Sequence, residues 1–205
     1  MLIYNRHITY FHYIPRNLMG LFITIGVIVI IALAYISLRN GLIGKKNQVA
    51  NAESSIDVML KKRFDLLPNL IETAKAYMHH EKSVLTELTE LRSQASNATS
   101  TDTKAALDKQ VSTALSHFRV AVEEYPELKA NENIDTVLRS MNEVEAQLSA
   151  ARRTFNASVT NFNNAVEMFP SSIIANHMNL TTLPLFDIPE VERQNVNAAG
   201  LFNNK

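Results

Sequence analysis

Residues 18–38 read LMGLFITIGVIVIIALAYISL, a run of 21 residues without a charged side chain. At a rise of about 1.5 Å per residue, some 20 apolar residues cross a hydrocarbon core of about 30 Å. Such a segment must be helical, because lipid offers no partners to open backbone groups. We therefore predict a transmembrane helix over residues 18–38, whose membrane-spanning side chains include Leu18, Phe22, Ile25, Val29, Leu33 and Ile36.

A cleaved signal peptide is the alternative for this segment. Ala32-Leu33-Ala34 matches a small-x-small cleavage pattern, and Arg6 and Arg16 could form the basic region in front of it. The apolar run, however, continues to Leu38 and exceeds the usual signal core of about 7–15 residues. We expect a retained anchor, and cleavage after Ala34 remains the open alternative.

The charges flanking the apolar run bear on its orientation. Two arginines precede the run, whereas three basic residues follow it closely, and the first acidic residue of the chain is Glu53. Positive charge favours the cytoplasmic side, so the count leans towards a cytoplasmic C-terminal domain. The basic residues that follow the run are also candidates for contact with anionic lipid: Arg39, Lys45 and Lys46.

Composition and motifs argue against several functions. The 20 basic and 20 acidic residues give a net charge of zero, which does not suit a general nucleic-acid binder. The chain has no Cys and no GxxxxGK, GxSxG or HExxH motif. The adjacent His79 and His80 would point about 100° apart on a helix, so they cannot bind one zinc ion as the two His of HExxH do. We predict no catalytic residue, cofactor, metal or small-molecule substrate.

The rest of the chain has the pattern of long helices. No Gly occurs between Gly44 and Pro170, and apolar residues recur at intervals of three and four. The first apolar stripe predicts one helix over about residues 45–95, kinked at Pro68. A polar loop follows at residues 93–102, where Thr101 or Asp102 can cap a second helix that ends at Pro126.

A third helix shows the clearest periodicity. It begins near Asn131 or Asn133 and ends before Pro170, with a phase shift of one residue after Phe155. The heptad-like spacing predicts helix-on-helix packing through the following seam: Ile134, Val137, Met141, Val144, Leu148, Ala151, Phe155, Val159, Phe162, Val166 and Phe169.

These elements predict an all-α protein. Its N-terminal transmembrane helix is followed by an elongated antiparallel bundle of three long helices, with a short C-terminal helix near residues 171–178. The boundaries are an N-terminal tail at 1–17, the span at 18–38, the bundle at 39–180 and a C-terminal tail at 181–205. Apolar residues at the start of this tail can pack on the bundle: Leu183, Leu185, Phe186 and Ile188.

Polar strips run beside two of the apolar stripes. Where two such helices meet, ion pairs and amide contacts can fix their register, and a metal or ligand site is the alternative. The candidates for this inter-helix network are Asp57, Arg63, Asp65, Asn69, Arg152 and Asn156.

Several blocks of sequence are similar to the LemA family of bacterial membrane-anchored proteins. They are NQVANAESSIDVMLKKRFDLLPNLIETAKAYMHHEKSVL at 47–85, YPELKANENI at 125–134, ARRTFNASVTNFNNAVEMFP at 151–170 and FPSSIIA at 169–175. The resemblance implies a short N-terminal tail, one span in the bacterial cytoplasmic (inner) membrane and an elongated helical bundle. It implies no established reaction and no catalytic residue.

The sequence leaves more than one function open. We expect a membrane-anchored, non-enzymatic scaffold that contacts lipid, self-associates as a homo-oligomer and organises membrane proteins. The alternative is a monomeric or dimeric adaptor or sensor that binds an envelope protease or a signalling protein. An enzyme with an unrecognised carboxylate site is the third possibility.

Overall fold

A computed structural model describes residues 16–186 of the chain, and these residues form helices joined by turns with no strand among them. The prediction of an all-α fold with an apolar N-terminal helix is confirmed. The six helices are α1 Arg16–Lys75, α2 Lys82–Asn97, α3 Thr101–Val122, α4 Pro126–Lys129, α5 Glu132–Glu167 and α6 Ser171–His177.

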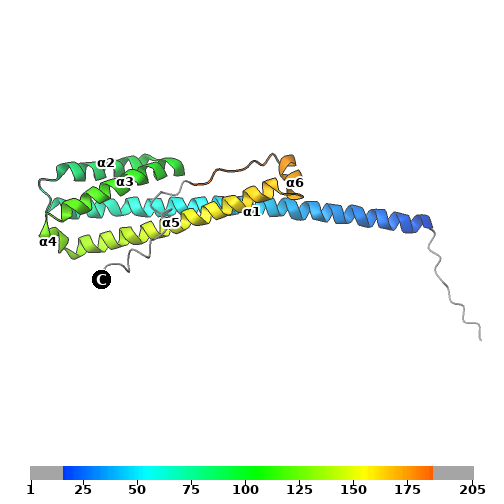
Figure 1. Ribbon diagram of the computed structural model, residues 1–205, viewed down its shortest axis with the longest axis horizontal. Coiled ribbons are helices and arrows are strands. Elements are labelled where there is room, and N and C mark those ends of the chain that lie inside the picture. Colours follow the sequence, from blue (N-terminus) through cyan, green and yellow to red (C-terminus); the bar gives the residue numbers. More distant parts are fainter. Residues whose placement is uncertain (1–15, 187–205) are drawn as a thin grey trace, which may run out of the picture.

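Helix α1 is the axis of the molecule (Figure 1). Its 60 residues correspond to a length of about 90 Å. The helix continues without a break from the apolar segment into the bundle, and Gly41 and Gly44 lie inside it. Figure 1 shows that the N-terminal part of α1 extends beyond the other helices. The apolar segment and the bundle are therefore joined by helix rather than by a linker.

The predicted single helix over residues 45–95 is wrong, because the structure divides it into two antiparallel helices. Pro68 lies inside α1, and the chain reverses only after Lys75. Met78 is 1% exposed in the turn, so the apolar stripe continues through it. The turn contains no Gly or Pro, and in the sequence the adjacent polar residues His79 and His80, both exposed in the structure, are what indicates its position. The bundle accordingly has four helices, α1, α2, α3 and α5, where three long helices were predicted.

The helix ends follow from local capping. Ser100, rather than Thr101 or Asp102, caps α3, and its hydroxyl accepts from Thr103 N at 3.1 Å. Helix α5 begins within the predicted range, and Asn131 caps it, because its side-chain oxygen accepts from the backbone N–H groups of Asn133 and Ile134 at 2.9 and 3.3 Å. Helix α6 confirms the predicted short helix.

The buried apolar residues form two clusters along the α1–α5 pair. The larger cluster fills the part of the bundle where α2 and α3 pack on α1, which also packs against α5. The smaller one joins α1, α5 and α6 and consists of Leu42, Val49, Val159, Phe162, Val166, Ile174 and Ala175. Phe155 packs against both clusters, at the position where the seam of α5 shifts its phase. The shift therefore marks the change from the part of the bundle that contains α2 and α3 to the part formed by α1, α5 and α6.

After α6 the chain returns along α5 as an extended segment, residues 179–186, which we term the C-terminal strap (Figure 1). Asn179 begins it in the left-handed region, with φ of 51°. Asn tolerates this conformation better than most residues, so it suits the sharp reversal. Leu183 and Phe186 pack against the clusters, whereas Leu185 is exposed. Ile188 lies outside the described residues.

Candidate functional site

A carboxylate buried between three helices is the centre of the polar interior. Asp108 of α3 is 2% exposed and lies between Arg63 of α1 and Arg152 of α5, which are 5% and 4% exposed. Arg63 Nη1 donates to Asp108 Oδ1 at 2.6 Å, and Arg152 Nη2 donates to Asp108 Oδ2 at 3.0 Å. One carboxylate thus connects three helices through both of its oxygens.

A second carboxylate completes the charge balance of this cluster. Glu145 of α5 places Oε2 2.5 Å from Arg63 Nη1 in an ion pair that lacks the alignment of a hydrogen bond. We term Arg63, Asp108, Glu145 and Arg152 the charge cluster; its formal charge is zero. The Nε atoms of both arginines are buried without a hydrogen-bond partner. The cluster is therefore neutral overall but incompletely hydrogen-bonded.

The charge cluster costs desolvation free energy and supplies specificity of packing. Removing ions from water costs free energy, and a protein with well-packed apolar side chains in place of a buried ion pair can be equally stable. The benefit is geometric, because any slip of α3 along α1 or α5 would separate buried opposite charges. A cavity of about 520 Å³ borders the cluster and is also lined by Ser112, Arg119 and Asn142.

The predicted network residues lie in several places. Arg63 and Arg152 meet in the charge cluster, whereas Asp57 accepts from Lys104 Nζ of α3 at 2.5 Å. Asp65 pairs with Lys61 on the exposed side of α1, at 2.7 Å, and the Asn69 side chain is exposed. Of the six candidates, the structure brings two together, Arg63 and Arg152, through their shared partner Asp108.

Sequence reasoning did not select Asp108, Glu145 or Lys104. Asp108 was recognisable, since it precedes Val111 by three and Leu115 by seven residues and so occupies the apolar stripe of α3. A charged residue at a seam position indicates a buried partner of opposite charge.

Elsewhere, on the exposed face of α5, a hydrogen bond to Asp135 raises the pKa of Arg139.

Asparagine side chains of α5 hold the C-terminal strap by its backbone. Asn163 accepts from Leu183 N at 2.8 Å and donates to Leu183 O at 2.9 Å. Asn156, one heptad earlier, accepts from Phe186 N at 2.7 Å and donates to Phe186 O at 3.0 Å. Each amide thereby satisfies both backbone groups of one residue, as a neighbouring strand would.

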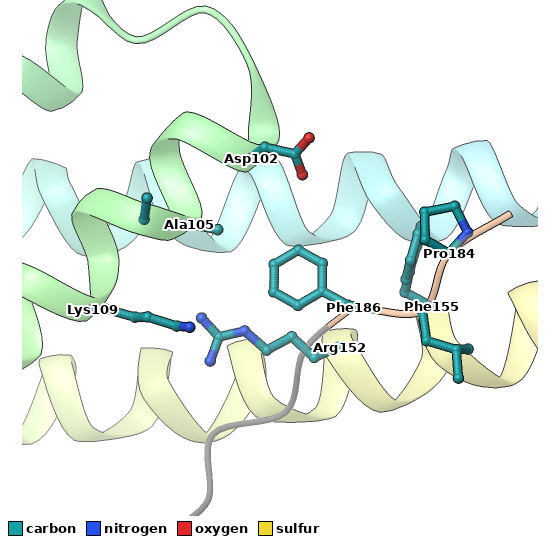
Figure 2. Close-up of a pocket in the computed structure, with 9 residues that line it drawn as sticks. Asp102, Ala105, Lys109, Arg152, Phe155, Pro184 and Phe186 are labelled. Carbon is teal, nitrogen blue, oxygen red and sulfur yellow. The ribbon is translucent and has the colours of Figure 1, made fainter.

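Phe186 links the strap to the charge cluster. Its ring lies 6.1 Å from the Phe155 ring in an edge-to-face arrangement, and the Arg152 guanidinium carbon is 5.5 Å from its centroid. Figure 2 shows Phe186 and Arg152 at a cavity of about 370 Å³, which Asp102 and Lys109 of α3 also line. The strap therefore covers one side of Arg152 and separates it from solvent.

The remaining candidates bear on membrane contact and metal binding. The side chains of residues 18–36 are almost all exposed, and within residues 16–186 α1 is the one helix long and apolar enough to cross a membrane. A signal sequence meets the same criterion. Arg39 and Lys46 are exposed and Lys45 is half-buried. In the described part of the chain, no three His, Asp or Glu side chains converge in a metal-binding arrangement.

The fold and the polar interior define a class: an all-helical protein whose apolar N-terminal helix continues directly into a bundle fastened by buried ions. The sequence profile of the LemA family matches residues 52–199, and the chain belongs to this family. It is 26% identical over 182 residues to Protein LemA of Metamycoplasma hominis, an alignment that covers 88% of this chain and 82% of that relative. The predicted family resemblance is confirmed.

Proposed function

We propose that this protein is a non-enzymatic scaffold, anchored in the bacterial cytoplasmic membrane by the apolar part of α1, whose copies associate and organise membrane proteins. The observation that carries the proposal is the continuity of α1 from residue 16 to residue 75. A helix without a linker transmits the orientation of the anchor to the bundle. The bundle of each copy therefore tilts and rotates together with its anchor.

Confinement to a membrane favours association between such copies. Anchors hold the bundles in two dimensions, so weak contacts along exposed helix faces act at a high effective concentration. Arg39, Lys45 and Lys46 directly follow the apolar segment and can add about 1 kcal/mol each by contact with anionic lipid. The same basic residues favour a cytoplasmic bundle.

Light scattering of the full-length protein in mild detergent, with the detergent mass subtracted, tests self-association. We expect a discrete oligomer much larger than a dimer. A monomer or dimer would instead favour the adaptor alternative, for which the strap and its neighbouring cavity are the relevant surface. The intact mass of the purified chain also tests retention of the anchor, because cleavage after Ala34 would remove 34 residues.

The absence of Cys allows a direct test of sidedness. Ser93→Cys places a single thiol at an exposed position of α2. In intact cells we expect this thiol to resist a membrane-impermeant reagent until the cytoplasmic membrane is opened. Labelling before that step would place the bundle on the outer side and overturn the cytoplasmic assignment while leaving the anchor in place.

A further inference from the structure

An apolar patch lies at the turn between α5 and α6. Met168, Phe169 and Ile173 are 62%, 80% and 63% exposed, and we term them the α5–α6 patch. Among the described residues, large exposed apolar side chains outside residues 18–36 are few: besides this patch they are Val58, Val120 and Leu185. Half of them thus occur within six consecutive residues. Clustering of this kind marks an interaction surface, whereas single exposed apolar residues are ordinary.

The packing of α6 sets the position of the patch along the molecule. Ile174 and Ala175, which adjoin the patch, are buried in the small cluster with Leu42 of α1. Leu38, the last residue of the apolar segment, packs against the same cluster. Leu38 and Leu42 are separated by about 6 Å along the helix axis. The patch therefore lies beside the end of the apolar segment, where the bundle stops and α1 continues alone (Figure 1).

This position selects a lipid surface as the partner. A segment of 21 residues fills the hydrocarbon core, so groups beside Leu38 are at the boundary between acyl chains and headgroups. Apolar and aromatic side chains are favoured at that boundary. Arg39 and Lys46, both exposed on α1 at the same end of the bundle, supply charge complementary to anionic headgroups.

We propose that Met168, Phe169 and Ile173 insert into the interface of the same bilayer that α1 crosses. This second contact, at the α5–α6 turn and the start of α6, fixes the tilt and rotation of the bundle, which a single helix leaves free. The inference rests on the proposed retention of the apolar segment as an anchor. It assigns a lipid-binding surface to residues that lie more than 120 positions beyond that segment in the sequence.

The absence of Trp makes the contact measurable at one position at a time. Phe169→Trp is made in the full-length protein, which is reconstituted into vesicles of zwitterionic and anionic phospholipid, with or without brominated acyl chains. Val120→Trp is the matched control, since Val120 is 68% exposed near the end of α3 that adjoins α4, at the opposite end of the bundle (Figure 1). Phe22→Trp, in the apolar segment, reports insertion of the anchor.

We expect blue-shifted emission from Phe169→Trp and a loss of about half its intensity on brominated lipid, with no change for Val120→Trp. Adding Met168→Ser and Ile173→Ser should reduce that loss. If Phe22→Trp is quenched while Phe169→Trp behaves like Val120→Trp, the patch does not touch lipid and the inference is overturned, although the anchor stands. If Phe22→Trp is not quenched either, the anchor itself fails, and the inference fails with it.

Discussion

Asp108 and Arg63 form a buried ion pair across the interface of α3 and α1, with 2.6 Å between Oδ1 and Nη1. The two residues are 45 positions apart, and Arg152 approaches the other carboxylate oxygen from α5. Because the three helices meet at one carboxylate, their relative positions along the bundle axis are mutually constrained. The pair is therefore better understood as a device for packing specificity than as a source of net stability.

Asp108→Ala tests this arrangement. The substitution leaves Arg152 buried without its carboxylate and Arg63 with Glu145 alone, so we expect a loss of about 3–5 kcal/mol of unfolding free energy. Denaturant titration of the detergent-solubilised protein, followed by circular dichroism, measures it. Asp65→Ala is the control, because Asp65 pairs with Lys61 in solvent and should cost less than about 1 kcal/mol. Equal effects of the two substitutions would contradict the structural role of the cluster.

Asn163→Ala tests how the strap is held. It removes the acceptor and the donor for Leu183, each worth about 0.5–1.5 kcal/mol, so the strap should detach more often. Hydrogen exchange measured by mass spectrometry should show faster exchange in peptides covering residues 179–186. Asn161→Ala removes the same side chain from an exposed position two residues earlier and should leave that exchange unchanged. Unchanged exchange in both variants would show that the apolar contacts of the strap suffice.

Asn131→Ala tests the start of α5. Asn131 caps two backbone N–H groups, and its amide donates to Tyr77 Oη at 3.0 Å, so it also connects the start of α5 to the turn between α1 and α2. We expect a loss of about 1–2 kcal/mol from the cap. Asn131→Asp keeps the cap acceptor and should cost much less, as thermal unfolding can show. A large loss in the Asp variant would place the main contribution in the bond to Tyr77.

Gly41→Ala combined with Gly44→Ala tests the continuity of α1. Both glycines have ordinary helical backbone, and an added Cβ meets no atom within 4 Å. Each substitution should stabilise the helix by up to about 1 kcal/mol, seen as a higher melting temperature. The oligomer mass should stay the same. A lower melting temperature or a smaller oligomer would reveal that another chain approaches the α1 backbone at these glycines.

Much of the secondary structure could be predicted, because it depends on local pattern. The apolar seam of α5 from Ile134 to Val166, the helix start near Asn131 and the stop before Pro170 are all properties of short stretches, and the structure has them. Phe169, the last residue predicted for the seam, is an exception, because α5 ends at Glu167 and the Phe169 side chain is 80% exposed. The α1–α2 reversal escaped prediction, because Met78 preserves the apolar stripe through a turn that lacks Gly and Pro. Periodicity reports which face of the chain is buried, and it does not report where the chain reverses.

Of the candidate site, too, one part could be predicted from the sequence and another part could not. The sequence by itself determined an all-helical chain with an apolar N-terminal segment, because the length of that segment, the position of the charges and the spacing of apolar residues are local properties of the sequence. It also identified Arg63 and Arg152 as polar residues beside apolar stripes. Only the tertiary structure decided that both arginines share Asp108, that Asn156 and Asn163 hold the strap, and that the α5–α6 patch lies beside Leu38. These residues are 20 to 135 positions apart in the sequence, and only tertiary packing brings them near one another.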